Sequence, residues 1–551
     1  MHYRIGLNVG DVAVEGERIY GDGVNIAARI ESLAEGGGVS ISGTVYDQVK
    51  NKLALSYAYQ GEQSVKNIVE PVRVWRVVMD EAAAALAATQ SMIRQASAET
   101  HGGGTAHRLR IRWPKGAMVL MSLLLLVGVI VSVQYLSLRL PTPSAKIPPA
   151  QPPLLPLPDK PSIAVLPFTN MSGDPEQEYF SDGMTETLIT DLSKISGLFV
   201  IARNSTFAYK GKAVKVEQVG RELGVRHVLE GSVQRADQRV RINAQLIDVT
   251  TGGHVWADRY DRQLQDIFTL QDEITRKIAF ALKVKLTPDE QERFRRVPTD
   301  NLEAYDCVLR GTTYHFHFTK DGNAQARQLY EKALELDPKY AGAYALLGDT
   351  YFQDWISQWS PDPQNPERAW EFVQKAIVLD DSLSLSHLIL GNLYLWKNRQ
   401  HELAVTEVER AIALAPNDAT AYMLLAWIFI HAGRPEEAIE KLEKAMRLDP
   451  HYPVHCLIFL GEAYWWLGRN EEAIASEKKA LLRNPDDLGA HLRLAVFYAE
   501  SGREEEAHAE IEESLRLSPN YSLEVVRQIT PYKNPADLER VLTALHKAGL
   551  K

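Results

Sequence analysis

The chain has 551 residues, of which 45 % are hydrophobic and 24 % charged, so it is too long for one core and should hold three or four folded units. Its formal net charge of -10 excludes the basic surface typical of nucleic-acid-binding proteins, and we expect no nucleic-acid partner. The two cysteines, Cys307 and Cys456, occur without a CxxC or HExxH motif, which argues against a zinc site or a disulfide framework.

The first 80 residues predict a small α/β segment. Residues 4–14 are typical of two short strands around a Gly-Asp turn. Residues 21–34 predict a glycine-rich turn that leads into an amphipathic helix, on which Asn25 and Arg29 share a face because they are four residues apart. The other expected elements are a strand at 38–42, a helix at 44–49 and a strand at 72–78.

Three short runs in this segment carry a specific resemblance. They are Ile-Tyr-Gly-Asp-Gly-Val-Asn-Ile-Ala-Ala-Arg at 19–29, Ile-Ser-Gly at 41–43 and Val-Lys-Asn-Ile at 65–68. With these runs, residues 1–80 resemble the C-terminal half of a class III adenylate/guanylate cyclase domain. The resemblance implies that Asn25 and Arg29 orient the ribose and stabilise the transition-state phosphate, and that Lys66 contacts the terminal phosphates. Cations set against developing charge are what phosphoryl transfer requires.

The cyclase resemblance leaves activity open. The carboxylates that hold metal in this family belong to the other half of the domain, so we expect no cofactor in the chain as written, and Mg²⁺ or Mn²⁺ is implied only for a complete domain. Arg18 stands where the family usually has an adenine-selecting Asp, so the choice between ATP and GTP stays open. Either the true start lies upstream, or this segment is a degenerate remnant. The resemblance also allows a homodimer through it.

A membrane anchor is predicted at residues 117–138. These 22 residues carry no charge and would reach about 33 Å as a helix, enough to cross a bilayer. The basic residues that precede this stretch are Arg108, Arg110, Arg112 and Lys115. By the positive-inside rule, residues 1–116 should be cytoplasmic and the remainder periplasmic, in a single-pass protein of the bacterial inner membrane. Linkers are expected at 81–116 and, with nine prolines in 141–161, at 139–161.

A second α/β domain is expected over residues 162–290. The predicted elements are strands at 163–168, 199–202, 225–234, 239–248 and 254–260, and helices at 180–194, 216–223 and 266–286. The runs Ile-Ala-Val-Leu-Pro-Phe at 163–168 and Leu-Glu-Gly-Ser-Val at 229–233 make this region similar to the N-terminal TolB-like domain, which implies a periplasmic binding or assembly module. Its Asp182, Glu186 and Asp191 favour a helix dipole and form no catalytic constellation.

The C-terminal region repeats with the period of tetratricopeptide (TPR) hairpins. Alanines 34 or 35 residues apart mark the second helices, and they are Ala376, Ala411, Ala445 and Ala480. Prolines with the same spacing end each hairpin, and they are Pro416, Pro450, Pro485 and Pro519. Gly433, Gly468 and Gly502 fit left-handed turns between paired helices. We therefore predict a solenoid of about six hairpins over 302–521, with a capping helix within 522–551.

One spacing departs from the period, because nine extra residues lie within 355–366. Solenoids of this kind curve, and their concave face commonly takes a peptide or a partner helix, so we expect a protein partner. The overall fold class is multidomain: a partial α/β cyclase-like fragment, one transmembrane helix, an α/β TolB-like domain and an all-α solenoid. The resulting hypothesis is a membrane-anchored signalling scaffold. The alternative is an active class III cyclase that makes cyclic nucleotide and pyrophosphate when a missing half is supplied.

Overall fold

The computed structural model describes residues 155–551 continuously and, nearer the N-terminus, residues 5–7, 13–15, 18–20, 30, 39–49, 56–63 and 72–78. The chain divides into two compact units, Met1–Ser144 and Ala145–Lys551, and each is described by itself. The predicted span at 117–138 lies outside the described residues. Among the residues that are described, no helix has the length and apolar character needed to cross a membrane. The anchor therefore stays a prediction.

The N-terminal unit contains a four-stranded sheet in the order β1-β4-β6-β5 and a separate hairpin, β2-β3. The elements are β1 Ile5–Leu7, β2 Ala13–Glu15, β3 Arg18–Tyr20, β4 Val39–Ser42, α2 Gly43–Val49, β5 Ser56–Gln63 and β6 Val72–Val78. Two short strands, β1 and β2, flank the predicted Gly-Asp turn as expected, but they do not pair with each other: β1 pairs in parallel with β4, and β2 pairs with β3. Long-range pairing overrides the local turn signal here.

A small apolar cluster holds this sheet to its helix. Ile41, Val45 and Val77 are buried together, and the rings of Tyr46 and Trp75 stack with their centroids 3.7 Å apart. Strand β5, which the sequence pattern did not indicate, pairs with β6 through a bulge near Gly61.

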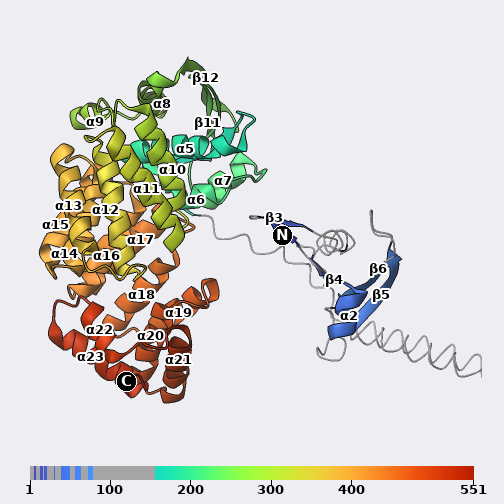
Figure 1. Ribbon diagram of the computed structural model, residues 1–551, viewed down its shortest axis with the longest axis vertical. Coiled ribbons are helices and arrows are strands. Elements are labelled where there is room, and N and C mark those ends of the chain that lie inside the picture. Colours follow the sequence, from blue (N-terminus) through green and yellow to red (C-terminus); the bar gives the residue numbers. More distant parts are fainter. Residues whose placement is uncertain are drawn as a thin grey trace, which may run out of the picture. The chain divides into compact units, whose positions relative to one another are not determined.

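The α/β domain of the second unit is built on a mixed six-stranded sheet (Figure 1). Its order is β12-β11-β10-β7-β9, with β8 beside β10. The strands are β7 Ser162–Val165, β8 Thr169–Asn170, β9 Phe199–Val200, β10 His227–Ala236, β11 Arg239–Asp248 and β12 His254–Gln263. The helices are η1 Pro175–Gln177, α5 Glu178–Ser193, α6 Arg203–Phe207, α7 Val216–Leu223, η2 Leu264–Asp266, α8 Ile267–Ala281 and α9 Pro288–Arg293.

Two predicted elements of this domain are shorter in the structure. The strand expected at 163–168 ends as β7 at Val165, before Pro167, which lacks the N–H that a central strand must donate, and the short strand β8 follows at Thr169–Asn170. The helix expected at 266–286 ends at Ala281, and α9 begins afresh with Pro288 in its first turn and a capping box between Thr287 and Glu290.

The solenoid consists of six helical hairpins (Figure 1). Their first helices are α10 Leu302–His315, α12 Ala341–Ile356, α14 Ser384–Trp396, α16 Ala419–His431, α18 Val454–Trp466 and α20 Leu488–Glu500. Their second helices are α11 Lys320–Leu336, α13 Asn365–Leu379, α15 His401–Leu414, α17 Pro435–Leu448, α19 Asn470–Arg483 and α21 Glu504–Leu517. Beyond them lie two helices rather than one, α22 Leu523–Ile529 and α23 Pro535–Lys547.

Close approach of the paired helices depends on small residues. A Cβ on Gly391 would lie 2.5 Å from Val408, and one on Gly348 would lie 2.8 Å from Val373. The left-handed turns predicted at the three glycines are confirmed, for example at Gly433 with φ +77°. The extra residues of the second hairpin lengthen α12 to 16 residues, against 13 in α14, and place 357–364 in a loop.

The α/β domain caps the first hairpin of the solenoid. Tyr305 of α10 stacks edge-on against Phe268 at 4.7 Å and accepts a hydrogen bond of 2.9 Å from buried Gln271. Asp306 accepts hydrogen bonds from Tyr179 (2.5 Å) and Arg235 (2.8 Å). A solenoid end must cover its apolar face, and here another domain does so.

The same domain also contacts the last residues of α17 and the loop between the third and fourth hairpins. The Ala202 N–H donates to the Leu448 carbonyl at 2.9 Å, and the Asn417 N–H donates to the Ser193 carbonyl at 3.2 Å. Arg447 donates to the Gly224 carbonyl at 2.8 Å. The α/β domain and the first four hairpins therefore share two separate contacts.

Candidate protein-interaction site

The residues predicted to act in nucleotide chemistry are Asn25, Arg29 and Lys66, and all three lie outside the described residues. Their roles therefore stay predictions. Within the described ranges, no group of three or more His, Cys, Asp or Glu is placed to hold a metal ion. The candidate site among the described residues therefore lies on the solenoid.

Residues 528–533, here called the tail segment, comprise the last two residues of α22 and the chain that leads from it toward α23, and they lie against the solenoid. The sequence explains why the helix ends at Ile529: Thr530 precedes Pro531 and takes φ -79° and ψ 124°, as a residue before proline prefers. Asn534 then caps α23 by accepting the Ala536 N–H at 3.1 Å. An extended step between two helices results.

The main chain of the tail segment is held by side chains and backbone of the third and fourth hairpins. Arg399 donates to the Gln528 carbonyl at 2.6 Å, and His401 Nε2 lies 2.6 Å from the Pro531 carbonyl oxygen. The Lys533 N–H donates to the carbonyl of His431 at 2.8 Å. These hydrogen bonds recognise the main chain of the tail segment and do not depend on its side chains.

Tyr532 supplies the side-chain recognition. Its hydroxyl donates to Glu462 Oε1 at 2.6 Å. Its ring stacks on His431 with centroids 4.7 Å apart and meets Trp466 edge-on at 5.5 Å. Next to it, Lys533 Nζ pairs with Glu402 at 2.5 Å, on the exposed side. We call Arg399, His401, Glu402, His431, Glu462 and Trp466 the tail-binding surface.

Burial and charge set the protonation states on this surface. Burial alone would raise the pKa of Glu462, but the Arg493 guanidinium and the hydrogen bond from the Tyr532 hydroxyl lower it below its ordinary value. Arg493 Nε donates to Glu462 at 2.8 Å. Burial lowers the pKa of His431 to about 4, so its ring is neutral at pH 7 and its Nδ1–H donates to the Trp427 carbonyl. Glu462 is therefore ionised, and its carboxylate accepts the hydrogen bond that the Tyr532 hydroxyl donates.

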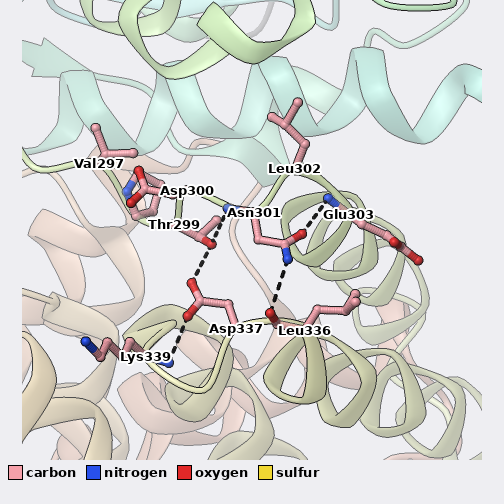
Figure 2. A pocket seen from close by; sticks show the side chains of 10 residues that line it. Val297, Thr299, Asp300, Asn301, Leu302, Glu303, Leu336, Asp337 and Lys339 are labelled. Carbon is pink, nitrogen blue, oxygen red and sulfur yellow. Dashed lines mark hydrogen bonds between the residues drawn. The ribbon is translucent and has the colours of Figure 1, made fainter.

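A hollow lies where the α/β domain joins the first hairpin, away from the tail-binding surface, and Figure 2 shows its lining. Its polar groups are already paired: Thr299 donates to Asp337 at 2.6 Å, and Asn301 donates to the Leu336 carbonyl at 3.1 Å. Asn301 Oδ1 also accepts the N–H groups of Glu303 and Ala304, which caps α10. This hollow is a structural junction.

Sequence reasoning missed the tail-binding surface. Two prolines four residues apart, Pro531 and Pro535, were the available signal for an extended step before the last helix. The partner residues could not be found in the same way, because His401 is 130 residues from Pro531 along the chain.

Family models match three regions of the chain. "Adenylate and Guanylate cyclase catalytic domain" matches residues 1–77, and "TolB amino-terminal domain" matches 158–255. Tetratricopeptide repeat models match 322–354, 393–453 and 468–524. The chain carries a cyclase-domain segment, a TolB amino-terminal domain and TPR repeats. The three resemblances inferred from the sequence are thereby confirmed.

Curated relatives extend these matches. "Putative adenylate cyclase 3" of Rhizobium meliloti (strain 1021) is 44 % identical over 401 residues, which cover 72 % of this chain and 58 % of that protein. This chain thus spans a little over half the length of that relative. "Superkiller complex protein 3" of Mus musculus is 25 % identical over 278 residues, 48 % of this chain and 17 % of that protein.

Among solved structures, an "Adenylate/Guanylate Cyclase/Hydrolase from Silicibacter pomeroyi" is 42 % identical, covers 14 % of this chain and 45 % of its own, and has a TM-score of 0.14. "YrrB: a TPR protein with an unusual peptide-binding site" is 20 % identical, covers 35 % of this chain and 93 % of its own, and has a TM-score of 0.26.

Proposed function

We propose that this chain is a membrane-anchored signalling scaffold of the nucleotide cyclase kind, whose solenoid binds a partner protein. The observation that carries the proposal is that the solenoid already holds residues 528–533 through hydrogen bonds to their backbone and through one partly buried aromatic side chain, Tyr532. Recognition of an extended peptide needs those two elements: main-chain contacts for affinity and a pocket for specificity. The order of cyclase segment, predicted anchor and TPR repeats supports the signalling role.

Site-specific photocrosslinking in cells tests the partner proposal. A photoreactive residue at Trp396, whose ring lies 6.5 Å from that of His431, should give a discrete adduct with another protein. The matched control is Leu482 on α19, which is 84 % exposed and does not belong to the tail-binding surface. Equal crosslinking at both positions, or none at Trp396, would contradict a partner at this surface.

The proposed anchor and orientation are tested separately. A reporter that is active only in the periplasm, fused after Lys551, should be active if residues 117–138 span the membrane with residues 1–116 in the cytoplasm. A reporter that is active only in the cytoplasm should be silent at the same position. The reverse pattern would overturn the orientation and leave the solenoid's binding role untouched.

The second candidate is catalysis, and the 44 % identity to a protein named as an adenylate cyclase favours testing it. In a complete cyclase, Asn25 and Arg29 would position the ribose and phosphate, Lys66 would bind the terminal phosphates, and Mg²⁺ or Mn²⁺ would neutralise charge. Purified chain incubated with ATP or GTP and either metal tests this directly. Cyclic nucleotide formation that Arg29→Ala abolishes would establish the enzyme, and no product in any combination would leave the scaffold role.

A further inference from the structure

The tail segment is bound as a ligand would be, although it belongs to the same chain. Its carbonyls at Gln528 and Pro531 and its N–H at Lys533 are all satisfied by the tail-binding surface. Tyr532 is the anchor, since it makes two ring contacts and one charged hydrogen bond there.

The turn of the third hairpin places Arg399 against the tail segment. Arg399 has φ +56°, and the residues at the turns of the first two hairpins, Phe318 and Gln358, have φ +52° and +54°. The left-handed conformation is therefore common to these turns, and what links Arg399 to the tail segment is its hydrogen bond to the Gln528 carbonyl.

Helix α22, apart from Gln528, is held by the C-terminal end of the chain. Val526 is buried in the core of the last hairpins, Arg527 pairs with Glu539 of α23 at 2.6 Å, and the Leu523 N–H donates to the Lys551 carbonyl at 3.1 Å. Helix α23 contributes Val541, Leu542 and Leu545 to the same core. These contacts hold both helices without the tail-binding surface, so a change at that surface involves residues 528–533 alone.

We propose that the tail-binding surface is a recognition site for an extended segment that carries a Pro-Tyr-basic sequence, and that the tail segment occupies it as an internal competitor. This inference rests on the proposed scaffold function and specifies the chemistry of the partner. The tyrosine hydroxyl is required because Glu462 is buried and charged, and the basic residue is favoured because Glu402 lies at the exposed end. A partner bearing this sequence replaces residues 528–533 and exposes them to solvent.

Competition with a tethered segment has a predictable size. A segment held by a short linker acts at an effective concentration on the order of mM, so it excludes a free peptide of equal intrinsic affinity. Weakening the internal copy without touching the surface should therefore raise the affinity for added peptide.

A labelled peptide of residues 526–537, titrated by fluorescence polarisation into the purified full chain, tests the proposal. Tyr532→Ala and, independently, Lys533→Glu should each bind the peptide at least tenfold more tightly than the unmodified chain. Lys533→Glu alters an exposed side chain, so its fold should be preserved even if Tyr532→Ala destabilises the protein. A peptide with Phe in place of Tyr should bind about tenfold more weakly, as should the wild-type peptide to a Tyr532→Ala/Glu462→Gln protein.

Peptide affinity that is the same for the unmodified chain and both variants, or no binding to a folded Lys533→Glu protein, would overturn the internal-ligand proposal. The crosslinking result at Trp396 is independent of this titration. A crosslinked partner together with failed peptide binding would mean that the solenoid binds a protein by a different chemistry.

Discussion

Two neighbouring contacts between first helices of the solenoid use the same positions in opposite ways. Between the fourth and fifth hairpins, Trp427 stacks on Phe459 with centroids 4.2 Å apart. One repeat later, the corresponding residues are Glu462 and Arg493, which form an ion pair at 2.8 Å. The stack is tolerant of small displacements, whereas the ion pair is directional. The comparison teaches that the scaffold accepts either pair, and that the charged one also orients Glu462 toward Tyr532.

The fifth hairpin departs from the others at a second position. The second helices of the preceding hairpins have Val373, Val408 and Leu442 where α19 has Glu477. Glu477 is fully buried, and neither of its carboxylate oxygens has a hydrogen-bond partner within the part of the chain that the structure describes. Burial raises its pKa well above the ordinary 4.5, which Glu462 and Asp487 reinforce and Arg493 opposes. The polar contact between the last hairpins therefore carries a cost that the aromatic contact does not.

Removing the Arg493 cation should have the largest effect on stability. Arg493→Met leaves Glu462 buried without its partner, and we expect a loss of about 3–5 kcal/mol in the free energy of unfolding, measured by urea titration. The matched control is Arg516→Met, because Arg516 pairs with Glu513 and Asp486 on the surface. That variant should change little. Equal losses in the two variants would show that Glu462 gains nothing from its buried pairing.

Replacing the unpaired carboxyl of Glu477 should stabilise the protein. Glu477→Leu restores the apolar residue used in the other hairpins, and we expect it to raise the free energy of unfolding by about 1–3 kcal/mol. Glu477→Gln keeps the shape and removes the charge, so it should gain less. A destabilised Glu477→Leu protein would show that the carboxyl has a stabilising role that its position does not reveal.

The gain from Glu477→Leu should depend on pH. The folded state holds the pKa of Glu477 above its unfolded value, so the unmodified protein loses stability relative to the variant as pH rises above about 4.5. The difference between the two should widen from pH 5 to pH 8, by at most about 1.4 kcal/mol per pH unit. Urea titrations of both proteins at four pH values measure it. Parallel pH curves would mean that Glu477 does not titrate with folding.

The aromatic contact should respond most weakly. Phe459→Leu keeps an apolar side chain and removes the stack on Trp427, so we expect a loss of about 1 kcal/mol, seen as a small fall in melting temperature. Phe459→Leu should not change peptide binding at the tail-binding surface, whereas Arg493→Met should weaken it. If Phe459→Leu and Arg493→Met weakened peptide binding equally, the ion pair would have no special role in orienting Glu462.

The repeat architecture could be predicted because it is local and periodic. Alanines 34 or 35 residues apart mark the second helices of four hairpins, and glycines with positive φ mark the turns of the last three. The cyclase and TolB resemblances rested on short runs of adjacent residues, and the family matches confirm them together with the TPR repeats. Membrane position and the roles of Asn25, Arg29 and Lys66 stay predictions.

The tail-binding surface could not be predicted, because it depends on contacts between distant residues. Tyr532 and Glu462 are 70 residues apart, and Lys533 and Glu402 are 131 apart. The same limit applies to the pairing of β1 with β4, where the nearby Gly-Asp turn was the stronger but misleading signal. Period and turn residues specify which helices form, whereas the shape of the stack decides which side chains meet across it.

The two contacts between the α/β domain and the solenoid have a mechanical consequence. A stack in which each repeat contacts only its neighbours is flexible, because its pitch changes by small shifts at each interface. Here the backbone bonds from Ala202 to Leu448 and from Asn417 to Ser193 tie later hairpins to the domain that covers the first one. These ties make the pitch of hairpins one to four stiffer than that of a stack whose repeats contact only their neighbours.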